Sequence, residues 1–317
     1  MAIQTGIDAQ LGLVSESTFG TYVAPTRFID FVSESLSLAV ERVESKAIRT
    51  GQRIMRSEDW APGTKTVEGD IELEVWNKSF GLVFKHMFGA VSTSGTAAPY
   101  VHEFTPGDLT AMTVQVGRPS VTNGTVRPFS YLGCVVDSWE LSAEVGEPIS
   151  LKLAVVGQDE VTSESLATAS YASSVELLTF VGASLTVSGT STDVKKLSFK
   201  GENGLNKERY FLGSRLHKVP LEGSMRNYEG EFEAEFTDLT LYDLYRNGTE
   251  AALVATYAGV SNPTHKLVVT TNVRFDGETP KVEGTDIVMN PMKFKCVATG
   301  ADSTAIKFQY YTPDSTP

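Results

Sequence analysis

Closely spaced carboxylates are the residues of this sequence that could most readily do chemistry. Glu72 and Glu74 alternate along one segment, and Glu231, Glu233 and Glu235 alternate along another. Two carboxylates can act as general acid and general base when their environments push the two pKa values apart. Here the spacing of two residues places each group on one face of a β-strand, in a single common environment. The pattern therefore predicts two acidic stripes on a surface and no catalytic pair.

The histidines do not form a metal site or a catalytic cluster in the sequence. His86, His102, His217 and His265 are dispersed, and none has a second His or Cys at metal-ligand spacing. We expect them to be surface histidines or buried ones with ordinary hydrogen-bond partners. The sequence contains no Walker-type loop, dinucleotide fingerprint or Gly-x-Ser-x-Gly turn. It predicts no enzyme, no cofactor and no metal.

Length and charge further narrow the class of protein. The 317 residues suit two ordinary domains, and 27 basic against 39 acidic residues give a net charge of −12. Such a charge repels nucleic-acid phosphates and anionic membranes. Cys134 and Cys296 lie in apolar runs and are expected to be small buried hydrophobes, which excludes a disulfide framework.

Targeting signals are not apparent. The segment Met1–Asp8 has no basic region followed by an apolar one, and no stretch approaches the roughly 18 apolar residues of a membrane-spanning helix. We expect no membrane insertion, and a protein made and kept in a cytosol unless it leaves by lysis.

The elements that position the stripes alternate with period two. Ile71, Leu73 and Val75 oppose the first stripe, so each stripe belongs to a half-buried strand. A helical spacing follows both strands, and Asn77 and Asp238 stand before it as predicted N-caps. Hairpins are expected for 135–141 with 149–156 and for 267–275 with 292–299.

Three pairs of similar segments occur in the same order. Residues 31–38 resemble 180–187, residues 67–75 resemble 228–236, and residues 148–159 resemble 291–302, at offsets of 149, 161 and 143. A duplication explains all three, and coincidental strand patterning is the alternative. The predicted fold is mainly β, a β-sandwich or barrel unit that occurs twice, each copy with one short flanking α-helix.

The duplication predicts the domain organisation. The first unit spans 31–159 and the second 176–302, joined by a small-polar linker at 160–175. Residues 1–30 form an extended N-terminal arm, and 303–317 form a C-terminal arm with one terminal strand.

Both units carry a long loop that is basic for so acidic a chain. Such loops favour pairing with an acidic surface on another copy, and a solvated loop is the alternative. The candidate residues for an inter-ring loop are Arg49, Arg53, Arg56, Lys207, Arg209 and Arg215.

The segment Gly12–Phe28, with Phe31–Leu36 and Arg49-Thr50-Gly51-Gln52-Arg53, resembles the tail tube (major tail) proteins of long-tailed siphophages. That resemblance implies a β-sandwich whose inner sheet joins its neighbours in a ring, a flanking helix, a loop that reaches the adjacent ring, and arms that bridge subunits. It implies a structural virion protein, assembled in the host bacterial cytoplasm, whose stacked rings convey the genome. The implied partners are the chain itself, the tape-measure protein, and the tail terminator and distal tail proteins, while viral DNA passes through without specific binding.

Ring size follows from the duplication. Rings of that family contain six tube units, each thought to give about four strands to a barrel of about 24. At roughly 4.8 Å between strands and roughly 40° of tilt, 24 strands give a diameter of roughly 48 Å and 12 give about 24 Å, too narrow for a DNA duplex. Two units per chain predict a trimer with pseudo-sixfold symmetry. A hexamer whose second half decorates the outside is the alternative.

The acidic stripes then acquire a role. We expect Glu72, Glu74, Glu231, Glu233 and Glu235 to face the lumen, where negative charge lets DNA slide; solvent outside the tube is the alternative. The competing function is a carbohydrate-binding or adhesion β-sandwich of a virion, with Trp60, Trp76 and Trp139 as a stacking platform.

Overall fold

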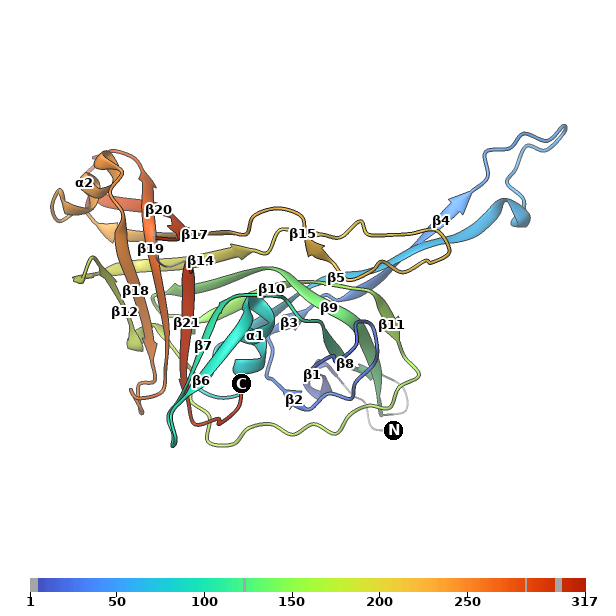
Figure 1. Ribbon diagram of the computed structural model, residues 1–317, viewed down its shortest axis with the longest axis horizontal. Coiled ribbons are helices and arrows are strands. Elements are labelled where there is room, and N and C mark those ends of the chain that lie inside the picture. Colours follow the sequence, from blue (N-terminus) through green and yellow to red (C-terminus); the bar gives the residue numbers. More distant parts are fainter. Residues whose placement is uncertain (1–4, 122–123, 283, 300–303) are drawn as a thin grey trace.

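Strands dominate the computed structural model, which describes residues 5–121, 124–282, 284–299 and 304–317 (Figure 1). Two α-helices, α1 (Gly81–Phe88) and α2 (Thr240–Asn247), occur in this part of the chain. The short 3-10 helices are η1 (Gly6–Asp8), η2 (Ser57–Asp59) and η3 (Phe180–Gly182). The mainly β fold predicted from the alternation is confirmed.

One continuous antiparallel sheet of eight strands runs through both units. Its neighbours are β4 (Ser37–Glu44), β5 (Trp60–Glu74), β10 (Ser150–Gly157), β9 (Thr125–Glu144), β14 (Val194–Glu202), β17 (Asn227–Glu235), β20 (Met289–Val297) and β19 (Lys266–Gly277), in that order. The short β3 (Ser33–Glu34) also pairs with β5. The first four strands come from the first unit and the last four from the second. The two halves meet where β9 pairs with β14.

The other strands continue from β9 and β19, the two strands that extend beyond this sheet. In the first unit these strands are β1 (Gln10–Ser15), β2 (Arg27–Phe28), β8 (Met112–Ser120) and β11 (Asp159–Val161). Two further strands pair with β19, β18 (Ala251–Ala258) and β21 (Ile306–Thr312). Beyond β18 follow β12 (Ala183–Val187) and β13 (Thr190–Thr192), and beyond β21 follow β7 (Tyr100–Pro106) and β6 (Gly89–Ser94). A separate pair joins β15 (Leu205–Asn206) and β16 (Leu221–Glu222).

The duplication is visible in the strand neighbours. In the first unit β1 pairs with β8 and β8 with β9, and in the second β12 pairs with β18 and β18 with β19. The pairing of residues 67–75 with 228–236 is confirmed. Gly69 and Gly230 are counterparts because a Cβ on either would lie 2.5 Å and 2.2 Å from the carbonyl oxygen of Ser35 and Ser198, respectively, on the adjacent strand.

The pairing of residues 31–38 with 180–187 is wrong. β3 pairs with β5 inside the eight-stranded sheet, whereas β12 pairs with β18 in the other layer. The counterpart of β12 is β1. Alternation of small polar and apolar residues marks a strand but does not encode its partners, so the sequence matched an edge strand of one layer with β12, which lies between β13 and β18 in the other.

The third pair joins equivalent strands in a shifted register. Val155 lies opposite Gly69 and Phe294 lies opposite Gly230, so Val155 and Phe294 are counterparts, at an offset of 139 instead of 143. The shared Pro and Lys are therefore coincidental. The shared Gly and Asp of the second copy, residues 300 and 302, lie outside the described residues.

Both predicted arms are built into sheets of the same chain. β1 pairs with β8, and Leu11, Leu13 and Phe28 are buried, although the surrounding residues are small and polar. The first unit therefore begins near residue 10 and not at 31. At the other end, the predicted terminal strand β21 lies between β19 of the second unit and β7 of the first.

The segment expected to be a linker crosses the first unit in contact with it. The backbone amide of Ala167 donates to Oε1 of Gln115 at 2.8 Å, and Nε2 of Gln115 donates to the carbonyl oxygen of Ser165 at 3.1 Å. A single glutamine of β8, Gln115, thus binds one backbone amide and one backbone carbonyl group of the crossing segment.

The helices lie where their spacing predicts them, but neither predicted residue is the N-cap, a position held by Phe80 in α1 and by Leu239 in α2. Asn77 does not cap α1, which begins at Gly81; its Oδ1 instead accepts from the backbone amide of Glu176 at 2.8 Å. Asp238 Oδ1 accepts from the amide of Thr240, the first residue of α2, at 2.7 Å. This hydrogen bond also lowers the pKa of Asp238.

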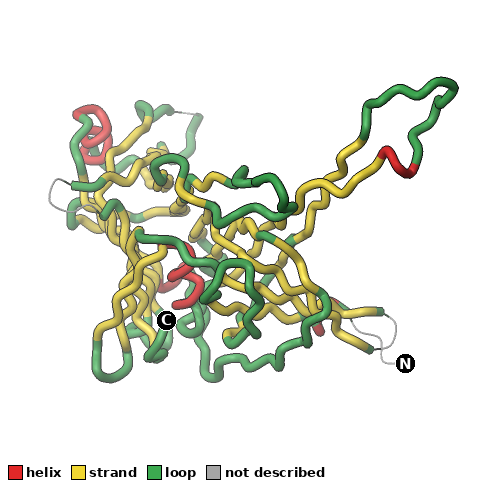
Figure 2. The backbone as a smooth tube through the Cα atoms, turned by 45° about the vertical axis from the view of Figure 1, so that its right-hand side comes forward, coloured by secondary structure: helices red, strands yellow, loops and turns green. Residues whose placement is uncertain are grey.

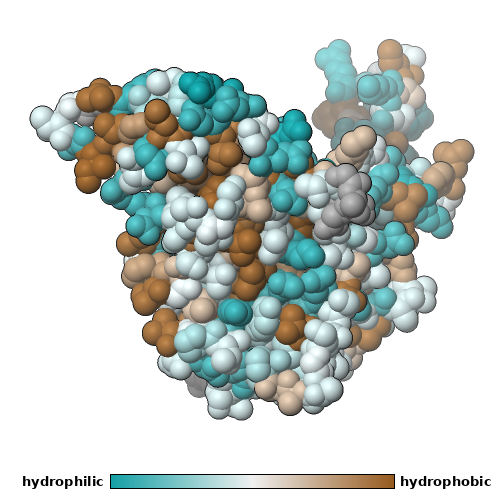
Figure 3. All heavy atoms as spheres, turned by 60° about the vertical axis from the view of Figure 1, so that its left-hand side comes forward, coloured by the Kyte–Doolittle hydropathy of each residue, from teal (hydrophilic) through white to brown (hydrophobic). Residues whose placement is uncertain are grey.

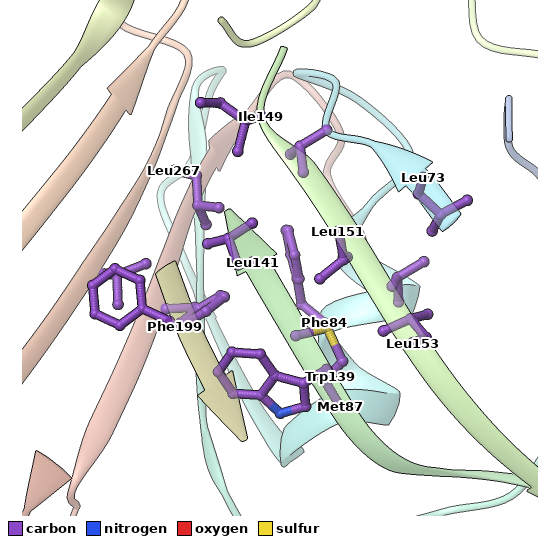
Figure 4. Close-up of a cluster of buried hydrophobic side chains, with 14 of the residues drawn as sticks. Leu73, Phe84, Met87, Trp139, Leu141, Ile149, Leu151, Leu153, Phe199 and Leu267 are labelled. Carbon is purple, nitrogen blue, oxygen red and sulfur yellow. The ribbon is translucent and has the colours of Figure 1, made fainter. Parts of the chain in front are cut away.

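One apolar core serves both units. Leu73, Leu141 and Leu151 of the eight-stranded sheet point toward Phe84 and Met87 of α1 (Figure 4). The ring of Phe308 in β21 lies 4.7 Å from Phe88 and 5.4 Å from Trp139, between ring centroids. Because a residue near the C-terminus fills the core of the first unit, the two units fold as one body.

We predict that Phe308→Ala lowers the free energy of unfolding by about 3–5 kcal/mol, since it removes a fully buried ring from between the units. Urea titration of the single variant measures the loss. Phe211→Ala is the matched control, because Phe211 is 56% exposed. Equal effects of the two substitutions would contradict the shared core.

Candidate functional site

The eight-stranded sheet has one buried face and one charged face, which we call the polar face. Strand alternation places Ile71, Leu73, Leu151 and Phe232 in the core, and the intervening side chains on the polar face. All five predicted stripe residues, Glu72, Glu74, Glu231, Glu233 and Glu235, lie on it. The pairing of β9 with β14 thus brings the two stripes onto a single surface.

Cross-strand neighbours on this face alternate in charge. One row crosses the sheet through Glu72, Lys152, Glu140, Lys200, Glu229 and Lys295, and ends at Arg274. Lys152 Nζ lies 2.9 Å from Asp70 Oδ2, and Lys200 Nζ lies 3.3 Å from Glu140 Oε1. Opposite charges at facing positions stabilise a sheet by about 0.2–1 kcal/mol per pair. The row therefore helps to hold the strands in register.

Carboxylates still outnumber cations on the polar face. Apart from β4, the described strands of the sheet present twelve carboxylates and seven cations there: Glu68, Asp70, Glu72, Glu74, Glu140, Glu144, Glu202, Glu229, Glu231, Glu233, Glu235 and Asp276, with Lys152, Lys195, Lys196, Lys200, Arg274, Lys293 and Lys295. Within the described part of the chain, Glu74, Glu231 and Glu233 make no ion pair. The face is mixed in charge, with an acidic excess.

Sequence reasoning missed these lysines. Lys152 alternates with Leu151 and Leu153, and Lys293 and Lys295 flank Phe294. Their alternation was the available signal, because it places them on the same kind of face as the glutamates. That the faces belong to one sheet is a property of the β9–β14 pairing, which no local pattern encodes.

Shallow hollows lie on the polar face in both units. A hollow of about 490 Å³ is lined by Glu72, Glu74, Glu140, Glu144, Glu147 and Lys152 among others. A second, of about 420 Å³, is lined by Glu231, Glu233, Asp276, Glu278, Lys196 and Lys293. Neither brings together groups arranged for catalysis, and both are open to solvent.

The basic loop of the first unit is the tip of a hairpin that projects from the body. β4 and β5 stay paired out to Glu44 and Trp60, beyond which residues 45–59 form the tip (Figure 2). Arg49 and Arg53 are exposed there, together with Ile48 and Ile54. Arg56 is tied to Asp59 by two hydrogen bonds at 3.1 and 2.5 Å.

The basic loop of the second unit folds back onto the first unit. Lys207 Nζ lies 2.6 Å from Asp137 Oδ2 on β9, and Arg215 Nε donates to the carbonyl oxygen of Gly63 on β5 at 2.7 Å. Arg209 donates to the carbonyl oxygen of Val219 within the same loop. Two of the three predicted cations of this loop therefore bind the first unit of their own chain.

A buried histidine anchors this second loop. His217 is fully buried, and its Nε2 lies 2.9 Å from the carbonyl oxygen of Gly157 at the end of β10. Gln158 Nε2 donates to the carbonyl oxygen of His217 at 2.7 Å, and the Tyr210 hydroxyl donates to that of Lys65 at 3.1 Å. The loop therefore braces the base of the projecting hairpin.

The tryptophans do not form a shared stacking platform. Trp139 is 3% exposed, so its ring is not available to a ligand, and Trp76 packs against the core despite its place in the alternation. Trp60 is exposed at the outer end of the hairpin strands, next to the tip. The face that comes forward in Figure 3 likewise intersperses hydrophilic and apolar side chains without one continuous apolar patch.

The histidines have ordinary partners, as expected. In buried His86, Nε2 lies 2.9 Å from the Ser15 hydroxyl and Nδ1 lies 2.9 Å from the carbonyl oxygen of Thr110. His102 lies between the Thr93 hydroxyl and the carbonyl oxygen of Asp314. The described residues contain no group of His, Cys, Asp and Glu placed to hold a metal ion. Nor do they contain a helix long and apolar enough to cross a membrane.

Comparison with known proteins places these surfaces in context. The model of a protein family described as phage tail tube protein matches residues 6–296. No curated protein matches the chain. The family match covers both units and includes β1, in agreement with the start of the first unit near residue 10.

We predict a pH-dependent loss of stability through His86. Burial lowers the pKa of His86 from 6.5 to about 4, so between these values the unfolded chain binds a proton that the folded chain does not. Stability therefore falls by up to about 3 kcal/mol as the pH falls through this window. Urea titrations of the wild type and His86→Gln at several pH values measure it. A stability difference between the two that does not change with pH would contradict the prediction.

Proposed function

The chain belongs to the phage tail tube protein family, and we propose that it is the tail tube subunit of a long non-contractile tail, as in siphophages. Copies assemble into rings that stack into a hollow tube, through which the genome passes into the host cell. The protein acts as a structural part of the virion and not as an enzyme.

The observation that carries the proposal is the continuous sheet of eight strands. Within one chain, the last strand of the first unit, β9, pairs with the first strand of the second, β14. The corresponding strands at the two ends of the sheet are β4 and the end of β19. Because β9–β14 is a junction between two equivalent units, it serves as a template for a junction between chains. Three chains joined in this way supply 24 strands in a ring with pseudo-sixfold symmetry.

The stagger of the strands supports closure at that size. The row of facing residues that starts at Glu72 on β5 reaches Glu229 on β17, four strands further along the sheet. The residue of β17 that is equivalent to Glu72 is instead Glu233. The stagger is four residues over four steps, or one residue per strand. An eight-stranded barrel with a shear of 8 has the same ratio and a tilt of about 36°. With that tilt, 24 strands about 4.8 Å apart form a barrel roughly 45 Å across, wide enough for a DNA duplex.

A hexamer with the second unit outside is less compatible with this geometry. Since the second unit continues the sheet of the first, removing it from the wall would require breaking the seven residue pairs between β9 and β14. The trimer keeps this pairing intact and repeats it.

We propose that the polar face lines the lumen. Its acidic excess repels DNA phosphates, and four of its six lysines, Lys152, Lys195, Lys196 and Lys200, are paired with carboxylates of neighbouring strands. A surface of this kind reduces the residence of DNA at any one site, the inverse of counterion-releasing binding. DNA then passes without specific binding, and the same lumen houses the tape-measure protein during assembly.

Contact between successive rings is proposed for the projecting hairpin. Its exposed Arg49 and Arg53 suit an acidic surface of a copy in the next ring. Of the other candidates, Arg56 is engaged with Asp59, and Lys207, Arg209 and Arg215 have partners in their own chain. The second loop therefore contributes to stacking by bracing the hairpin.

The remaining proposals follow from the role. At its two ends the tube meets the tail terminator and the distal tail proteins. Assembly takes place in the cytoplasm of the host bacterium, and the chain does not insert into a membrane.

We predict that the purified protein at high concentration forms hollow tubes or rings with three chains and six lobes. Negative-stain electron microscopy with symmetry classification of end-on views, and the mass of isolated rings, test this. Rings of six chains would keep the tube role and overturn the trimer. Persistent monomers would overturn the tube role.

We also predict that reversing charge on the polar face leaves assembly intact but impairs ejection. Glu74→Lys, Glu231→Lys and Glu233→Lys remove carboxylates without an ion pair and turn them into phosphate-binding cations, so DNA is retained. The measurement is the rate of DNA release from phages whose tails carry the variant. The matched control is Asp108→Lys, an exposed carboxylate outside the eight-stranded sheet that makes no ion pair in the described part of the chain. Normal ejection by the triple variant would sink the lumen assignment.

A further inference from the structure

The eight-stranded sheet ends in the edge formed by β3 and β4, next to β5. Side chains of the same chain bind main-chain groups on this edge. The amide of Ser35 donates to the carbonyl oxygen of Asp70 on β5, at 2.9 Å. Since the main-chain groups of successive residues in a strand point to opposite sides, those of Leu36 face away from β5, toward the edge. These are the groups that an additional strand would bind.

Three side chains bind the main-chain groups of Leu36. Its amide donates to Glu34 Oε2 at 3.0 Å, and its carbonyl oxygen accepts from Arg118 Nη2 at 2.7 Å and from the Tyr131 hydroxyl at 2.8 Å. Arg118 in turn holds Glu34 through two hydrogen bonds, of 3.0 and 2.9 Å. The guanidinium also lies 4.6 Å from the ring centroid of Phe129. The arrangement satisfies both edge groups of one residue.

The equivalent positions in the second unit can be compared with this edge. Glu34 lies opposite Ile71, and Leu197 lies opposite Phe232, the counterpart of Ile71. Leu197 is therefore the counterpart of Glu34, and Phe199 that of Leu36. Phe199 has a strand neighbour, because it pairs with Leu141 of β9. Where the strand is internal the position holds leucine, and where it is an edge the position holds a paired glutamate.

We propose that this edge receives the sheet of a second copy of the chain, and that Glu34 with Arg118 guards it until a ring forms. An inward-pointing charge on an edge strand is an established way to prevent edge-to-edge association. When the second copy pairs, its strand replaces Glu34 at the amide of Leu36. The inference rests on the proposed self-association, and adds to it a barrier against polymerisation of free chains.

The end of β19 is the segment of the second copy that fits this edge. The pairing of β18 with β19 ends at Val273, so Arg274–Gly277 have a strand, β20, on one side only among the described residues. Gly277 is the counterpart of Trp139, so Thr279, two residues further on, is the counterpart of Leu141 and would lie opposite Leu36. β19 is the counterpart of β9, which pairs with the counterpart of this edge inside the chain. The contact is heterologous, and it closes into a ring because each chain carries one edge of each kind.

The test compares assembly of the wild type with Glu34→Leu, which introduces the residue of the second unit, and with Glu34→Gln, which keeps an acceptor but loses the charge. We expect the critical concentration for tube formation, measured by light scattering and sedimentation, to fall about tenfold in Glu34→Leu and by less in Glu34→Gln. Thermal unfolding of the free chains shows whether each variant is folded. Glu44→Gln on β4 is the matched control, and its critical concentration should not change.

Hydrogen exchange of the Leu36 amide provides a second measurement. We expect protection in free wild type, loss of protection in free Glu34→Leu, and protection in tubes of both. An unchanged or raised critical concentration in Glu34→Leu would overturn the guard, as would a Leu36 amide that stays exposed in tubes. These results leave the tube role standing as long as the wild type forms tubes. Failure of the wild type to assemble overturns the proposed function itself.

Discussion

The pairing of β9 with β14 is the interaction on which the rest of the structure depends. It converts two four-stranded halves into one sheet, aligns their charged sides on one surface and sets a stagger of one residue per strand. It also forces the two cores to merge, since Trp139 of β9 packs against Tyr228 of β17 at 6.1 Å between ring centroids. With a different partner for β14, the carboxylates of the two units would lie on unrelated surfaces.

Local patterns predicted the elements better than their neighbours. Alternation identified β5 and β17 and their buried sides, because burial of every second residue is a property of a single strand. It failed for 31–38 and 180–187, which belong to different layers, and it shifted the third pair by four residues. The helix after each strand was predicted from the spacing of apolar residues. Asn77, however, binds the backbone amide of Glu176, a tertiary contact that no local pattern predicts. Partner choice depends on the whole fold, and a pattern within one segment does not contain it.

The candidate surfaces divide along the same line. The glutamates of the polar face were found from their spacing, whereas the lysines between them became meaningful only once neighbouring strands were known. The two basic loops are similar in composition but differ in their contacts. The loop with Arg49 projects, and the loop with Arg215 is bound to β5, because His217 and Tyr210 give it apolar and hydrogen-bonding anchors that the first loop lacks. Charge alone therefore does not distinguish a contact between chains from one within a chain.

The brace has a geometric consequence for a tube built of such chains. If only the first unit of each chain projects a hairpin, the lateral wall repeats six times around the axis while the axial contacts repeat three times. Successive rings can then be superposed by turns of 120°, and a turn of 60° would place a hairpin against a unit of the wrong kind. The duplication thus gives the tube a rotational phase, which a ring of six identical units would not have.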